Sequence, residues 1–183
     1  MNIKVLGCQP LRRELYALAA LSPHEVAIDL LSPDSPLELI QQKINAETGA
    51  DYIVLAMGAC TAQNLCSADR PLVIARVHNC AHLLLGSTER FHRVFSENED
   101  APCWQMTPQC PKCTPRRGVP CMVGSALSGS AARPTPGVRE YVADLSLLKR
   151  LMDGAWGEDD ILTVSPGCRI IADPVEILST EPV

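Results

Sequence analysis

Short apolar runs recur along the first half of the chain, and each one ends in a turn or loop signal. They lie at residues 3–6, 25–31, 51–57 and 72–77, and glycine, proline or polar residues bound them. Runs of this length between turn signals indicate buried strands. The run at 51–57 has no polar alternation, which is typical of a strand covered on both faces of its sheet. These four segments are therefore predicted to be strands.

Helical spacing of apolar residues follows the strands. It covers residues 11–19 and 37–44, and the segment Ser35–Glu38 fits a capping box with a proline at the first helical position. After Cys80 the pattern is helical again, and Gly86-Ser87 divides it into two predicted helices. The repeated order of strand and helix predicts an α/β fold: a three-layer open sheet, mostly parallel, with right-handed crossovers.

The stretch from residue 101 to 137 departs from this pattern. It holds seven of the fifteen prolines and four of the nine cysteines, with little periodicity. Connections of this length are usually functional, ordered by a ligand or disordered. We interpret it as a Cys/Pro-rich insertion in a single domain spanning residues 1–183. An amphipathic helix at 145–152 and a last strand at 161–164 are predicted after it.

Charge and hydropathy restrict the classes of partner. The net charge of -5 and the pI near 5.3 argue against a nucleic-acid partner, because phosphate neutralisation needs clustered Lys and Arg. No apolar run approaches the ~20 residues needed to cross a bilayer, so no membrane association is expected. The first residues resemble a strand rather than a signal peptide. We expect a cytoplasmic protein.

Nine cysteines in a reducing compartment favour thiolate chemistry or metal binding over a disulfide framework. Four of them come at or just after the end of a predicted strand: Cys8, Cys60, Cys80 and Cys168. Ligands of open parallel sheets bind outside the carboxyl ends of the strands, so these cysteines are predicted to share one edge. Thiolates in such a group suit Zn²⁺ or an iron–sulfur cluster. The alternative for each cysteine is a small buried apolar side chain.

Three further residues lie close to these cysteines in sequence. His78 could donate a nitrogen ligand or orient the Cys80 thiolate. His82 could also donate a nitrogen ligand, but it is two residues from Cys80, and residues so spaced on a helix do not face each other, so a surface or helix-packing histidine is favoured. Arg76 interrupts an apolar strand, where a charge is costly unless paired. It is predicted either to bind an anionic ligand at the sheet edge or to form a structural ion pair.

The insertion carries a second candidate metal site. Cys110 and Cys113 have the two-residue gap of many zinc ligands, and Cys103 and Cys121 could complete four thiolates. A redox disulfide is the competing interpretation of this motif, but such motifs normally open a helix after a strand, whereas here the pair lies among prolines. The two groups of cysteines could also meet, with the insertion folded over the sheet edge.

The strand-end motifs resemble the family grouped as the domain of unknown function 1638 (DUF1638). The resemblance is carried by Leu6-Gly-Cys8, Ile53–Cys60, Pro71–Arg90, Asp144–Trp156 and Val164–Gly167. This chain has Asn79 where an aspartate is common in the family, and Thr61 where a glycine is common. The resemblance implies an accessory role beside corrinoid-dependent methyl-transfer systems of anaerobes, whose proteins are then the expected partners.

Three functions remain open. The first is a cysteine-ligated metal or iron–sulfur protein in anaerobic methyl-transfer or one-carbon metabolism. The second is a metal-free enzyme in which Cys80 or Cys60 is a thiolate nucleophile and His78 its base. The third is a ligand-binding module whose thiols are buried and structural.

Overall fold

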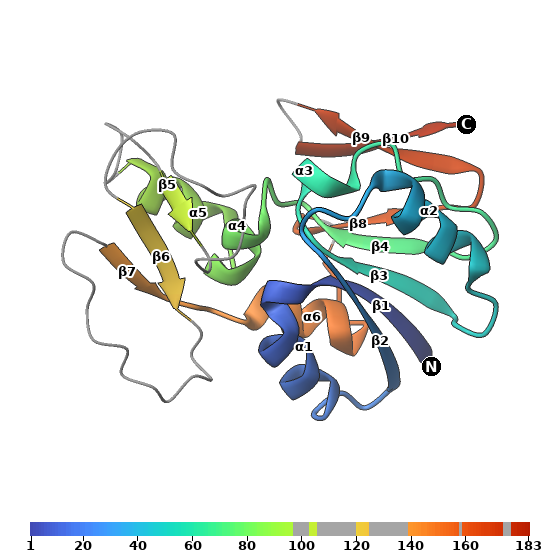
Figure 1. Ribbon diagram of the computed structural model, residues 1–183, viewed down its shortest axis with the longest axis horizontal. Coiled ribbons are helices and arrows are strands. Elements are labelled where there is room, and N and C mark those ends of the chain that lie inside the picture. The colour runs from blue at the N-terminus through green and yellow to red at the C-terminus, as the bar shows by residue number, and fades with distance from the viewer. Residues whose placement is uncertain (97–102, 106–119, 125–138, 158, 174–176) are drawn as a thin grey trace.

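The computed structural model describes residues 1–96, 103–105, 120–124, 139–157, 159–173 and 177–183 (Figure 1). The strands of the main sheet are β1 (Asn2–Cys8), β2 (Glu25–Leu31), β3 (Tyr52–Ala56), β4 (Leu72–Ala75) and β8 (Ile161–Val164). The helices are η1 (Gln9–Leu11), α1 (Arg12–Ala19), α2 (Leu37–Ala46), α3 (Ala59–Ala62), α4 (Cys80–Leu85), α5 (Thr88–Ser96) and α6 (Ser146–Asp153). All the strands and helices predicted for the regular part of the chain are present, with bounds that differ by a few residues.

The main sheet has the order β2-β1-β3-β4-β8. The first four strands are parallel, with Val54 of β3 opposite Val5 of β1 and Val73 of β4. Strand β8 is antiparallel to β4, and Thr163 lies opposite Val73. The predicted α/β fold with a mostly parallel open sheet is confirmed. The direction of β8 has consequences for the cysteines that follow it.

Both faces of the sheet are covered, which explains the apolar run in β3. Val54 faces a core formed with α1, α4, α5 and α6, whereas Leu55 faces a second core formed with α2, α3 and a hairpin. That hairpin pairs β9 (Cys168–Asp173) with β10 (Ile177–Pro182) in antiparallel fashion. Figure 1 shows α1 and α6 on one side of the sheet and α2, α3 and the hairpin on the other. Alternating β3 side chains thus enter different cores.

Regular structure occurs in the predicted insertion. Strands β5 (Cys103–Gln105), β6 (Pro120–Gly124) and β7 (Arg139–Val142) form a separate parallel sheet in the order β5-β6-β7. It lies at the end of the molecule that carries α4 and α5 (Figure 1). Strands β5 and β6 lie within residues 101–137 and β7 follows directly after them, and the sequence pattern predicted none of the three. The rest of the insertion lies outside the described residues.

The predicted capping box is wrong. Pro36 is itself the N-cap residue of α2, in an extended conformation with φ -66° and ψ 151°, and no side chain bonds the first turn. Ser35 instead donates its backbone N–H to the Ser32 carbonyl in the preceding turn, at 2.9 Å. Among the described helices, none is long and apolar enough to cross a membrane.

Candidate thiol site

Two loops meet in backbone contact where β3 and β4 end. The Ala59 amide donates to the Val77 carbonyl at 2.9 Å, and the Cys60 amide donates to the His78 carbonyl at 3.2 Å. A Cβ atom on Gly58 would lie 2.3 Å from the Asn79 Cα atom, so no larger residue fits between the two loops without moving backbone. Glycine at this position therefore permits the close approach that joins the loops.

This contact brings together cysteines that are distant in sequence. Cys80 opens α4 and Cys8 ends β1, and each is only 6% exposed. Their side chains hydrogen-bond to each other, and the Gly58 backbone also bonds the Cys80 side chain. The pKa of Cys80 is raised well above its usual value by the bond to Cys8, by burial, and by the charges of Cys8 and Cys60. Gly58 opposes that rise, as expected of an N–H donor to sulfur.

Cys60 lies beside this pair but is exposed. Its Sγ contacts the Thr61 hydroxyl at 3.6 Å. Within the described part of the chain, no three His, Cys, Asp or Glu side chains gather closely enough to hold a metal ion. The structure therefore brings three of the four predicted strand-end cysteines to one edge, with two of them in contact and the third adjacent.

His82 packs inside the helical layer. It is fully buried, and its ring stacks on Phe91 with the centroids 4.2 Å apart and the planes 7° apart. Nδ1 accepts a hydrogen bond from the His78 amide at 3.3 Å, so in the neutral ring Nε2 carries the proton. A protonated Nε2 has no lone pair for a metal. Of the two favoured roles, surface or helix packing, the helix-packing one agrees with this geometry.

The electrostatics of His82 follow from its burial. Its pKa is lowered to about 3, chiefly by burial and further by the nearby charges of His78 and His92. Its Nε2 has no hydrogen-bond partner among the described residues. The imidazole is therefore neutral across the physiological pH range.

The sequence departure at Asn79 has a local structural role. Asn79 is the N-cap residue of α4, and its Oδ1 accepts from the His82 amide at 2.9 Å. Asparagine and aspartate both fit this position, so the replacement preserves the cap. His78, next to it, is exposed and lies 5.6 Å from the Phe91 ring centroid. Partial burial and the charge of His92 lower the pKa of His78. No described hydrogen bond joins its ring to a cysteine, so its role as base or ligand stays a prediction.

Arg76 points away from the thiols. Its Nη1 donates to the Leu178 carbonyl on β10 at 2.5 Å. Leu178 belongs to the core on the α2 side of the sheet, whereas Cys8 and Cys80 belong to the core on the α1 side. The structure thus gives Arg76 a structural contact, with a backbone carbonyl instead of the predicted ion pair. Its predicted contact with a ligand at the thiol edge has no support in this placement.

The prediction that Cys168 shares the thiol edge is wrong. Because β8 runs antiparallel to β4, its carboxyl end lies where the parallel strands begin. The Cys168 carbonyl accepts from the Ser67 amide at 2.9 Å, in the segment that leads into β4. Cys66 lies at the same end and pairs with Arg169. A strand reversed in the sheet carries its terminal residue to the opposite edge.

The insertion cysteines are only partly located. The backbone sets Cys103 opposite Pro120 and Cys121 opposite Trp104, which places the two cysteines on neighbouring strands. Cys110 and Cys113 lie outside the described residues. The four-thiolate site in the insertion stays a prediction.

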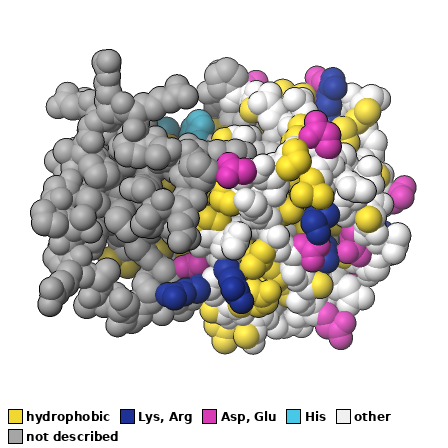
Figure 2. Space-filling view, viewed as in Figure 1, with side chains coloured by type: hydrophobic (Ala, Val, Ile, Leu, Met, Phe, Trp, Pro, Cys, Tyr) yellow, Lys and Arg dark blue, Asp and Glu magenta, His cyan; other side chains and the backbone are white. Residues whose placement is uncertain are grey.

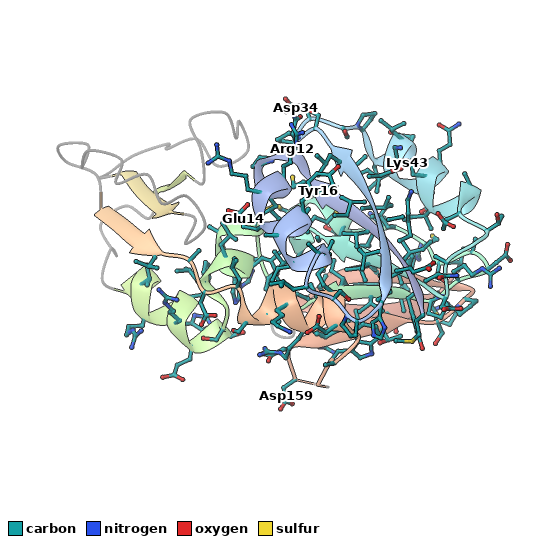
Figure 3. All side chains as sticks on the ribbon, turned by 90° about the horizontal axis from the view of Figure 1, so that it is seen from below. Arg12, Glu14, Tyr16, Asp34, Lys43 and Asp159 are labelled. Carbon is teal, nitrogen blue, oxygen red and sulfur yellow. The ribbon has the colours of Figure 1, made fainter. Side chains whose placement is uncertain are left out.

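Sequence reasoning missed a buried carboxylate. Glu14 is 3% exposed in the first turn of α1, whereas Tyr16 on the same helix is 50% exposed and receives the Arg12 guanidinium over its ring. Figure 3 labels all three side chains. No hydrogen bond or ion pair between the Glu14 carboxylate and another described side chain is seen. No sequence pattern signals this burial, because a glutamate in a first helical turn is ordinarily a solvated residue that complements the helix dipole.

The family model described as a protein of unknown function (DUF1638) matches residues 32–116. Over these residues the chain is similar to the DUF1638 family. The match covers somewhat under half of the 183 residues, less than the sequence motifs suggested. It includes both loops of the thiol site, with Cys60 and Cys80, whereas Cys8 lies before it. No curated protein and no solved structure matches the chain significantly.

Proposed function

We propose that this DUF1638 protein binds a soft metal ion or an iron–sulfur cluster through Cys8, Cys60 and Cys80. The observation that carries the proposal is the convergence of these cysteines from the ends of three adjacent parallel strands, with the Cys8 and Cys80 side chains hydrogen-bonded. Sulfur is the donor preferred by Zn²⁺, Cu(I) and iron–sulfur clusters. The donor set therefore fits such a group in its chemistry, and binding would require the exposed Cys60 side chain to close on the Cys8–Cys80 pair, because the three described side chains do not gather closely enough as they stand.

The electrostatics also fit a cation. The hydrogen bond with Cys8, burial, and repulsion from the neighbouring Cys8 and Cys60 thiolates raise the pKa of Cys80. A bound cation supplies the compensating charge and displaces the thiol protons. The Gly58 backbone bond to Cys80 favours the thiolate, as hydrogen bonds to sulfur do in iron–sulfur proteins. Cys60 is exposed, whereas Cys8 and Cys80 are buried.

The biological role proposed with this site is accessory to corrinoid-dependent methyl transfer or one-carbon metabolism in anaerobes. That part rests on the family resemblance alone. On the face shown in Figure 2, acidic and basic side chains of the described residues are interspersed, and the net charge of the whole chain is -5. These charges favour a protein or small-molecule partner over nucleic acid.

In the alternative function, a metal-free enzyme with a cysteine nucleophile, the same geometry favours one cysteine over the other. Burial and a raised pKa disfavour Cys80 as the nucleophile for a substrate that arrives from solution. Cys60 is exposed and is the better candidate nucleophile. No described hydrogen bond joins the His78 ring to Cys60, so that reaction would need His78 to move or another base.

Metal analysis and absorption spectra of protein purified without oxygen test the proposal. Wild-type protein should retain metal after reconstitution with Zn²⁺, or with iron and sulfide, and Cys80→Ser should lose it. Cys66→Ser is the matched control because Cys66 lies at the other end of the strands, and it should retain the metal. A wild-type protein that binds neither group, or a Cys80→Ser protein with full occupancy, rules out this site.

The insertion is tested separately. If its cysteines form an independent site, replacing both Cys110 and Cys113 with Ser releases only part of the metal and leaves the α/β core folded. Loss of all metal from a folded Cys8→Ser protein contradicts two independent sites. Circular dichroism of each variant distinguishes metal loss from unfolding.

A further inference from the structure

The Cys8 and Cys80 thiols are paired in a way that metal binding does not require. They hydrogen-bond to each other although they are 72 positions apart in the chain (80 minus 8) and lie on β1 and α4. Both are 6% exposed, so an oxidant in solution has little direct access to either sulfur. Two thiols in such contact are suited to oxidation to a disulfide, provided that another thiol delivers the oxidising equivalent.

Cys60 is placed to make that delivery. It is exposed, and its charge acts on Cys80. Its backbone amide bonds the His78 carbonyl at 3.2 Å, two residues before Cys80, so the loops that carry the two cysteines are held together. We propose that Cys8 and Cys80 form a reversible disulfide, and that Cys60 is the relay thiol through which a small organic disulfide oxidises them.

The chemistry is thiol–disulfide exchange in three steps. The Cys60 thiolate attacks one sulfur of the external disulfide, forms a mixed disulfide and releases one thiolate, which takes up a proton. The Cys80 thiolate attacks the Cys60 sulfur and releases the second external thiolate. The Cys8 thiolate then attacks Cys80 and frees Cys60. The protein loses two thiol protons and two electrons, and the external disulfide is reduced to two thiols.

The cysteines at the opposite end of the strands lack this arrangement. Cys66 is paired with Arg169 rather than with Cys168, and its Sγ donates to the Asn64 carbonyl at 3.6 Å. The comparison makes Cys66→Ser a matched control. If the proposed metal function also holds, the disulfide removes two of the ligands, so oxidation and metal binding exclude each other. Only this last consequence rests on the proposed function.

The test uses full-length, metal-free protein incubated with hydroxyethyl disulfide. Free thiols are titrated over time, and the cross-linked peptides are identified by mass spectrometry without reduction. Wild-type protein should acquire a Cys8–Cys80 link that dithiothreitol reverses. Cys60→Ser should form the same link at least roughly ten-fold more slowly, because access limits exchange at buried sulfur. Cys66→Ser should react at the wild-type rate.

Several results overturn the proposal. If wild-type protein forms no Cys8–Cys80 link and Cys60 stays in a stable mixed disulfide, the proposed Cys8–Cys80 disulfide is wrong. If Cys60→Ser forms the Cys8–Cys80 link at the wild-type rate, Cys60 is not the relay thiol. Failure of the metal proposal is distinguishable, because the metal-free protein is tested directly: a chain that never binds metal can still form the link. A protein that binds metal but never forms the link contradicts the disulfide proposal and leaves the metal proposal intact.

Discussion

The two ends of the parallel strands both carry cysteines, but only one end gathers them. At the carboxyl end, the Cys8 and Cys80 side chains hydrogen-bond to each other and Cys60 lies beside them. At the amino end, Cys66 and Cys168 lie on paired segments, but the bridge joins Cys66 to Arg169. Residues that follow parallel strands lie at the same edge of the sheet. The difference between the ends shows that strand direction, more than nearness to a strand end, decides which cysteines can cooperate.

The largest effect is expected at the contact between the two loops of the carboxyl end. Gly58→Ala places a Cβ atom 2.3 Å from the Asn79 Cα atom, and backbone must move to relieve the clash. We expect a loss of about 3 kcal/mol in the free energy of unfolding, the upper part of the usual range for overpacking. Urea denaturation of purified protein measures it. The separated loops should also bind less metal.

Two other glycines provide the controls. Gly157→Ala should change stability little, because a Cβ atom there meets nothing within 4 Å. Gly167, at the amino end, also has open space but adopts φ +80°, so Gly167→Ala should cost about 1 kcal/mol from backbone strain alone. Equal losses for Gly58→Ala and Gly157→Ala would contradict the close approach of the loops.

A pH-dependent effect is expected next, from His82. Its pKa is about 3 in the folded protein against 6.5 for the free side chain, so the unfolded chain takes up the proton first. The stabilisation from neutral His82 is therefore complete above pH 6.5 and decreases as the pH falls toward 3. By pH 5 the free energy of unfolding should be lower by roughly 2 kcal/mol. His82→Asn retains an acceptor for the His78 amide but cannot titrate, and its stability should change less over this interval.

Urea midpoints of metal-free protein at pH 7 and pH 5 check this. The comparison is between the pH slopes of the two proteins, because loss of the stacking on Phe91 will lower the stability of the variant at every pH. Parallel slopes would show that His82 is not the titrating group. Asp29 also has a lowered pKa, chiefly through its bond to Lys43, but its stabilisation is lost only near and below pH 3.8.

The smallest effect is expected at the amino end. The Gln41 side chain accepts from the Cys66 amide at 2.7 Å and donates to the Cys66 carbonyl at 3.0 Å. Gln41→Ala should cost roughly 1 kcal/mol and speed alkylation of Cys66 by iodoacetamide, since both bonds are lost. The exposed Gln42→Ala is the control, with the same helix and the same substitution. Unchanged Cys66 alkylation in Gln41→Ala would show that these bonds do not hold the segment.

The sequence by itself determined the fold class and most of the thiol site. Unbroken apolar runs such as 51–57 required cover on both faces, and the order of strand and helix required mostly parallel strands. The carboxyl-end rule then placed Cys8, Cys60 and Cys80 together, because each follows a parallel strand. Local patterns are enough to predict the strands and the residues that follow them, because each of these depends only on residues near one another in the chain.

Only the tertiary structure decided the rest. The direction of β8 depends on how the chain returns after the insertion, and it moved Cys168 to the far edge. The partner of Arg76 is the Leu178 carbonyl, 102 residues away, and no local pattern specifies such a contact. The hydrogen bond between Cys8 and Cys80 likewise depends on how closely Gly58 lets two loops approach. Spacing along the chain indicates which residues reach an edge, whereas packing decides which side chains touch.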